Sequence, residues 1–114
     1  MHCGWGFVVL FEVFPRVYRY VGAARGDLLA ERGAFPVDAP NNGVAEIHGV
    51  AAAMIWVLQA GIRAPINVYA DNAHAPAVAQ AAQGAQTNRA AAEWAHVVAT
   101  ELEGHLQGFP LAFA

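Results

Sequence analysis

The sequence predicts an α/β fold with a mixed (α+β) sheet, built as a single domain across residues 1–114. Three observations predict it. Runs rich in aromatic and β-branched residues open the chain, two long stretches repeat apolar residues at helical spacing, and a short apolar run lies between them. An order of strands, helix, strand, helices and strand is typical of α/β and α+β proteins.

The first third of the chain reads as strands. We expect one strand from Gly6 to Phe14, ended by Pro15, and a second from Val17 to Val21, where residue types alternate. Leu28 to Phe35 could be a third strand or the true partner of the first, and the residues leave both arrangements open. Three glycines are expected at turns: Gly22, Gly26 and Gly33.

A long helix is predicted in the middle of the chain, from about Val44 to Gln59. Asn41 or Asn42 would cap its start, and Gly61 would end it by taking the left-handed conformation. The residues of its buried stripe follow helical spacing: Ile47, Val50, Ala51, Met54 and Leu58.

Shorter elements complete the pattern. A strand is expected from Ile66 to Ala70, followed by an alanine-rich helix from Ala75 to Gln83. A further helix should run from Asn88 to Leu102, because its apolar residues recur every three or four positions. The last residues, from Phe109, read as the beginning of another strand.

Charge and cysteine content restrict the class of protein. The net charge of −3 argues against a strongly basic nucleic-acid binder, and a single cysteine excludes an internal disulfide. The segment from Met1 to Phe14 lacks the cationic start of a signal peptide, and the apolar stretch from Val50 to Ile62 is too short to span a bilayer. We therefore expect an intracellular protein, cytoplasmic or nuclear, with no signal peptide, transmembrane segment or membrane partner.

Two acids stand at structurally related places. Glu46 opens the long helix, and Asp71 ends the strand that follows it. A helix start and a strand end can lie side by side in an α/β layer, and two carboxylates placed there can begin to hold a divalent metal. Two structural alternatives stay open: Glu46 as a first-turn acid favoured by the helix dipole, and Asp71 as a cap for the next helix.

Other polar and aromatic residues have simpler interpretations. His48 is expected to be a solvated surface histidine rather than a ligand. The tryptophans are expected to pack in the core or between helices rather than to stack on bases: Trp5, Trp56 and Trp94.

Several short motifs, in this order, resemble the ribonuclease H type 1 family, in particular its retroelement-like members. Ala45 to Gly49 (Ala-Glu-Ile-His-Gly), preceded by Asn42, is similar to the family's "N…AEIHA" helix start. Tyr69 to Asn72 (Tyr-Ala-Asp-Asn) is similar to its "YTDS" strand end, and Trp5 to Val9 is similar to its Trp-Gly second strand. Gln86 to Asn88 resembles the start of a later helix in the retroelement-like members.

The resemblance implies a function and a site. Members of the family cut the RNA strand of RNA–DNA hybrids with two divalent cations, usually Mg²⁺ and alternatively Mn²⁺. Glu46 and Asp71 would be catalytic metal ligands, and Asn42 would contact the minor groove of the hybrid.

The sequence also departs from the family. Only two of its four metal-binding carboxylates have matching positions, because the family's first strand and its final helix have no counterpart in these residues. We therefore expect an incomplete ribonuclease H-like domain, truncated at both ends and inactive as an isolated chain. The alternatives are a non-catalytic degenerate module that binds nucleic acid or protein, and an unrelated small α/β domain in which both acids are caps.

Overall fold

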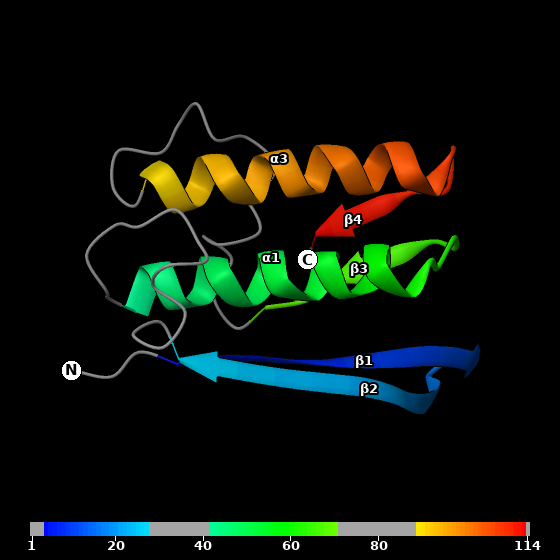
Figure 1. The fold of residues 1–114 in the computed structure, drawn as a ribbon. Coiled ribbons are helices and arrows are strands. Elements are labelled where there is room, and N and C mark those ends of the chain that lie inside the picture. Colours follow the sequence, from blue (N-terminus) through cyan, green and yellow to red (C-terminus); the bar gives the residue numbers. More distant parts are fainter. Residues whose placement is uncertain (1–3, 28–41, 71–88, 114) are drawn as a thin grey trace.

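The computed structural model describes residues 4–27, 42–70 and 89–113 (Figure 1). Their elements follow the order β1, β2, α1, β3, α3 and β4, which confirms a mixed α/β layout. The possible strand at Leu28–Phe35, the turn at Gly33 and the helix at Ala75–Gln83 lie outside the described residues.

The two long strands form an antiparallel hairpin. β1 (Gly4–Phe14) pairs with β2 (Val17–Asp27), so the partner of the first strand is the segment directly after it. Arg16 occupies the turn with a φ of 66°, and its backbone N–H donates to Glu12 Oε2 at 3.2 Å. β2 ends at Asp27, six residues beyond its predicted end at Val21.

The prediction of turns at two glycines is wrong. Gly22 and Gly26 lie inside β2, paired with Val9 and Trp5 of β1. Gly22 is needed for space, because a Cβ at this position would lie 2.8 Å from Cζ2 of Trp56. Glycine in a strand often marks such a close approach, and nothing local in the sequence shows which side chain comes close.

Helix α1 (Asn42–Ala60) confirms the predicted long helix, with two further residues at its start and one at its end. Gly61 has a φ of 71°, and its N–H donates to the carbonyl of Leu58. The N–H of Ile62 donates to the carbonyl of Val57. These two bonds form a Schellman motif, so Gly61 ends the helix by the predicted left-handed conformation.

The second half of the chain forms a parallel pair of short strands joined through a helix. β3 (Ile66–Val68) pairs in parallel with β4 (Leu111–Phe113), and α3 (Arg89–Leu106) precedes β4. The ladder continues where the N–H of Ile66 donates to the carbonyl of Pro110 at 2.9 Å. α3 extends four residues beyond its predicted end at Leu102.

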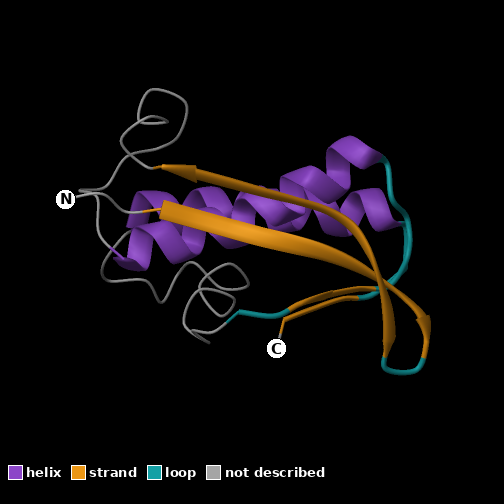
Figure 2. Cartoon of the chain, turned by 90° about the horizontal axis from the view of Figure 1, so that it is seen from below, coloured by secondary structure: helices purple, strands orange, loops and turns teal. Residues whose placement is uncertain are grey.

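The core lies mainly between α1 and α3, which run side by side in the same direction (Figure 1). Six of the fourteen buried apolar residues in the described chain are alanines, and such small side chains let two helices approach closely. The hairpin crosses one side of this helix pair, and β1 is the strand closer to β3 and β4 (Figure 2). Four residues of the predicted stripe in α1 are buried, and the fifth, Leu58, is half-buried.

Two side chains form hydrogen-bond contacts between the C-terminal end of α3 and the residues that follow α1. Arg63 Nε donates to the carbonyl of His105 at 2.9 Å, and His105 Nε2 lies 3.0 Å from the carbonyl of Ile62. The arginine thereby satisfies one of the last carbonyls of α3, which has no partner within its own helix.

Helix α1 is longer than the apolar stretch expected from Val50 to Ile62. By length and composition alone, its window Gly43–Ala60 could cross a membrane, with a mean hydropathy of 1.4. In the structure, 44% of this window is buried inside the protein, where α1 packs against α3 and β1.

Candidate functional site

Glu46 lies in the second turn of α1, and its side chain is exposed. Its neighbours in the chain, Ala45 and Ile47, are buried in the core. The helix therefore presents the carboxylate outward from a rigid position, as a metal ligand requires.

The other predicted site residues are less fully described. Asn42 is the first residue of α1, so it begins the helix that carries Glu46. Asp71 lies outside the described residues, and the chain is described up to Ala70.

The directions of α1 and β3 indicate toward which end of the molecule Glu46 and the end of the described strand segment lie. α1 and β3 run in opposite directions, so the start of the helix and the end of the strand lie toward the same end of the molecule (Figure 1). Glu46 is about 21 Å along the axis from Ala60 at the helical rise of 1.5 Å per residue. Ala70 is about 13 Å along the chain from Ile66 at the strand rise. Both positions are thus displaced toward the end where α1 begins.

The residues of β3 and the two that follow it alternate in exposure. Ile66, Val68 and Ala70 are half-buried and pack against the core, whereas Asn67 and Tyr69 are exposed. The described strand ends at Val68, two residues earlier than predicted.

The expectation that His48 is solvated is wrong. Its side chain is only 4% exposed, and its ring centroid lies 5.1 Å from that of Trp94 on α3. His48 follows Val44 by four residues and precedes Ala51 by three, so it shares their buried face of the helix. That spacing was the signal in the sequence from which its burial could have been predicted.

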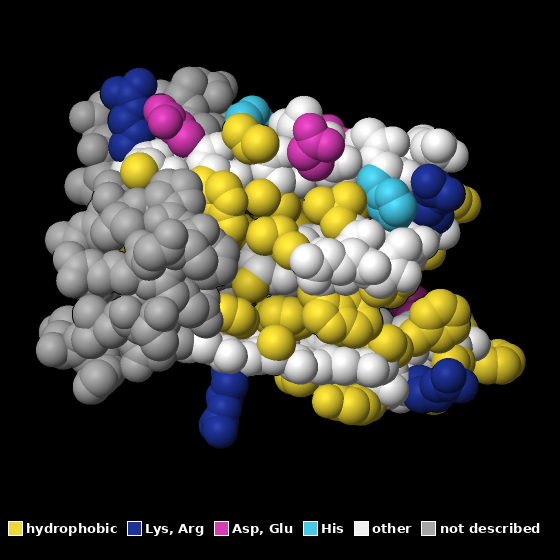
Figure 3. All heavy atoms as spheres, in the orientation of Figure 1, with side chains coloured by type: hydrophobic (Ala, Val, Ile, Leu, Met, Phe, Trp, Pro, Cys, Tyr) yellow, Lys and Arg dark blue, Asp and Glu magenta, His cyan; other side chains and the backbone are white. Residues whose placement is uncertain are grey.

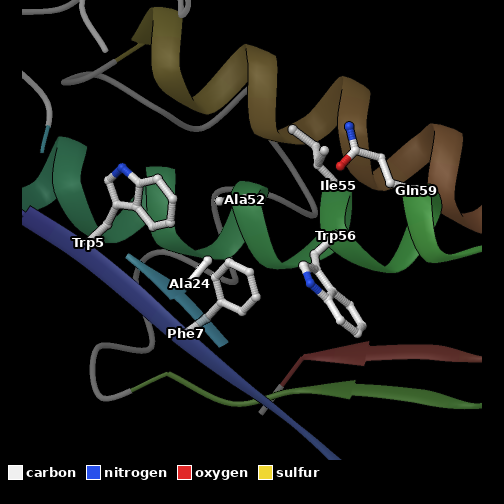
Figure 4. Close-up of a pocket in the computed structure, with 7 residues that line it drawn as sticks. All are labelled: Trp5, Phe7, Ala24, Ala52, Ile55, Trp56 and Gln59. Carbon is white, nitrogen blue, oxygen red and sulfur yellow. The ribbon is translucent and has the colours of Figure 1, made fainter. Parts of the chain in front are cut away.

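The tryptophans pack as predicted, and two of them line a pocket. All three are half-buried against the core: Trp5, Trp56 and Trp94. A pocket of about 370 Å³ lies between the hairpin and α1 (Figure 4). Its lining comes from both hairpin strands and one side of α1: Trp5, Phe7, Ala24, Ala52, Ile55, Trp56 and Gln59. Since Gln59 is the only polar side chain in this lining, the pocket suits an apolar group rather than a metal or a phosphate.

The turn end of the hairpin has an apolar surface (Figure 3). Nine of the twelve exposed large hydrophobic residues in the described chain lie on β1 and β2. One titratable group here is perturbed: the negative charge of Glu12 raises the pKa of the Tyr18 phenol above its ordinary value of 10.0. Desolvation, a hydrogen bond to Glu12 and the nearby Tyr69 act in the same direction.

Within residues 4–27, 42–70 and 89–113, no three histidine, cysteine or acidic side chains form a group that could hold a metal ion. Comparisons with protein-family models, with curated proteins and with solved structures find no match to this chain.

Proposed function

We propose that this chain is a ribonuclease H-like domain in which Glu46 and Asp71 are the candidate metal ligands. The observation that carries the proposal is the placement of Glu46: it is exposed near the start of α1, toward the end of the molecule where the segment containing Asp71 begins. The order of elements adds support, since an antiparallel hairpin, a helix and a parallel strand pair agree with the motif resemblance.

The donor set limits the chemistry that we assign. Glu46 is the one described carboxylate at the matching positions, and Asp71 would be the second. Two carboxylates do not fit a pair of Mg²⁺ ions as four do, because each ion needs several oxygen ligands and partial neutralisation. We therefore assign no hydrolytic step to this chain, and we expect little or no cleavage of RNA–DNA hybrids by the 114-residue polypeptide.

The proposal requires the two carboxylates to share one divalent cation. Mn²⁺ added to the ¹⁵N-labelled chain should broaden amide NMR signals around Glu46 and Asp71 before signals elsewhere. Glu46→Gln and Asp71→Asn should each abolish this local broadening. Glu103→Gln is the matched control, because Glu103 is an exposed acid near the C-terminal end of α3. This variant should leave the broadening unchanged. Broadening that either site variant leaves intact would refute a shared cation.

A second assay separates the catalytic and non-catalytic forms of the proposal. A labelled RNA–DNA hybrid is incubated with the chain and Mg²⁺ or Mn²⁺, with Glu46→Gln and Asp71→Asn alongside. Metal-dependent cleavage that both substitutions abolish would contradict the expected inactivity. Hybrid binding that needs no metal would instead favour the non-catalytic module.

A further inference from the structure

The two faces of the β1–β2 hairpin have different surroundings. The inner face lies against α1, because a Cβ at Gly49 of this helix would lie 3.5 Å from Cβ of Trp5. The ring of Phe7 stacks on that of Trp5, with the two centroids 6.2 Å apart, so both side chains point inward. Side chains alternate along a strand, so the even-numbered residues of β1 up to Glu12 belong to the outer face. The helices lie on the inner side of the hairpin (Figure 1), and Figure 2 looks onto the outer face.

The centre of the outer face is apolar and exposed. Val8 and Leu10 are 62% and 52% exposed, and Tyr20, which pairs with Leu10, is 65% exposed. Ala23 pairs with Val8 and is also exposed. Figure 3 shows apolar side chains projecting from the side of the hairpin that faces away from the helices. Contiguous exposed apolar side chains of this kind mark a surface for interaction.

Charged residues of opposite sign lie at the two ends of this apolar centre. Glu12, toward the turn, pairs with Tyr18, whose phenol donates a hydrogen bond to the carboxylate. Arg25, toward the open end of the hairpin, pairs with Gly6. A Cβ at Gly6 would lie 3.7 Å from Cβ of Arg25, so both residues belong to the same face. The outer face thus has an acid at one end, a base at the other and apolar side chains between them.

This distribution of charge is complementary to itself in one orientation. Two copies can bring their outer faces together about a twofold axis with their strands running in the same or in opposite directions. In the same direction, Glu12 of one copy meets Glu12 of the other, and like charges at an interface are unfavourable. In opposite directions, Glu12 of each copy lies over Gly6 of the other, beside Arg25. Because Gly6 has no side chain, the arginine has space to reach the carboxylate.

The apolar centre is complementary in size in the same orientation. With the strands reversed, Val8 lies over Leu10 of the second copy, and Ala23 lies over Tyr20. A small side chain thus faces a large one on β2, which lets the two faces approach closely. Sheets that pack face to face keep their strands within about 30° of each other, so this orientation is an ordinary packing geometry.

We propose that two copies of this chain form a twofold dimer through the outer faces of their hairpins, with Glu12 of each copy paired with Arg25 of the other. From the strand rise and spacing, the face is about 33 Å long and about 10 Å wide. This area of about 330 Å² is small against the 800 Å² or so that each partner contributes to a standard interface. The dimer should therefore be weak and reversible. The inference is independent of the proposed nuclease ancestry.

Sedimentation equilibrium tests whether the chain self-associates. Between about 10 μM and about 500 μM, a range that covers weak interfaces of this size, the average molar mass should rise from that of one chain toward that of two. A mass above that of two chains should not appear, because a twofold contact uses the same face on both copies and closes the assembly.

Charge reversal tests which residues make the contact. Glu12→Arg and Arg25→Glu each place like charges at both ion pairs, so each variant should dimerise about tenfold or more weakly than the natural chain. An equal mixture of the two variants should dimerise again, since every ion pair between unlike copies then has one acid and one base. Arg19→Glu is the matched control: it makes the same change on the same strand, but Arg19 pairs with Phe11 on the inner face.

A neutral variant guards against a loss of folding in the reversed ones. Glu12→Gln keeps an oxygen that can accept from the backbone N–H of Arg16, as Glu12 does in the turn. It should weaken dimerisation by about two- to tenfold, as expected for partly exposed ion pairs.

Recovery in the mixture, with no effect of Arg19→Glu, supports the proposal. Three outcomes would overturn it. The first is a chain that stays monomeric up to about 500 μM, which would mean that a different partner covers this face. The second is a dimer that Glu12→Gln and both reversals leave unchanged, which would place the contact elsewhere. The third is folded reversal variants whose mixture associates no better than either one alone.

Discussion

Gly22→Ala tests whether the contact between β2 and α1 constrains the sequence. The added methyl group would lie 2.8 Å from Cζ2 of Trp56. Carbon atoms pack best about 3.5–4.0 Å apart, so the two groups would have to separate by about 0.7 Å or more. Overpacking of this kind costs about 1–3 kcal/mol. Alanine recovers about 0.5–1 kcal/mol relative to glycine within a strand, so the net loss of stability should be about 0–2.5 kcal/mol.

Gly6→Ala is the matched control for this substitution. Its added methyl group would lie 3.6 Å from the carbonyl oxygen of Ala24 and 3.7 Å from Cβ of Arg25, which are ordinary contacts. This variant should gain the strand preference without the packing cost, so the two variants should differ by about 1–3 kcal/mol. Urea denaturation followed by tryptophan fluorescence measures both free energies of unfolding.

The same experiment in a Trp56→Phe background identifies the cause. Phenylalanine is shorter than tryptophan, so the difference between Gly22→Ala and Gly6→Ala should largely disappear, and the double-mutant cycle should report the coupling directly. Equal stability of the two variants in the natural background would refute the close approach. A difference that persists without Trp56 would assign the cost to another contact.

Three further predictions follow from contacts elsewhere. Leu102→Ala removes a fully buried side chain and should destabilise the chain by about 2–5 kcal/mol, lowering the urea midpoint; an unchanged midpoint would contradict its place in the core. Arg63→Ala removes the hydrogen bond to the carbonyl of His105 and should cost about 0.5–1.5 kcal/mol in the same assay, whereas no loss would mean that water replaces it fully. Glu12→Gln should lower the pKa of Tyr18 toward 10.0, because it removes the largest cause of the upward shift; ultraviolet titration of tyrosinate absorbance measures this. Since the folded-state pKa is raised, the phenol favours folding below pH 10.0, and that contribution disappears as the pH rises through the folded value.

The sequence was sufficient for most elements because their signals are local. Pro15 and the β-forming residues on either side of it indicated two strands, and Gly61 marked the end of α1 through a conformation that glycine adopts readily. Pairing was harder, because alternation within Val17–Val21 says nothing about which strand it meets. The prediction of turns at Gly22 and Gly26 was wrong for a related reason. Gly22 is required by the close approach of Trp56, which lies in another element and leaves no local signal in the sequence.

The candidate site was only partly accessible to sequence reasoning. Helical spacing predicted that Ile47 is buried, and the exposed position of Glu46 follows from its place beside that stripe. His48 is buried although histidine is a polar residue type, because its spacing from Val44 places it on the buried face of α1. The relation of Glu46 to Asp71 stays a prediction, since it depends on the course of the chain beyond Ala70.

The bonds that Arg63 and His105 make have a practical consequence for experiments on the site. They lie where α1 and α3 end, whereas Glu46 is about 21 Å away along the helix axis at 1.5 Å per residue. Energetic effects at that separation normally add. A substitution at Arg63 can therefore be combined with one at Glu46 to lower global stability by a known increment while ligand binding is measured independently. Substitutions at Arg63 and at Glu46 therefore allow global stability and the candidate site to be varied separately.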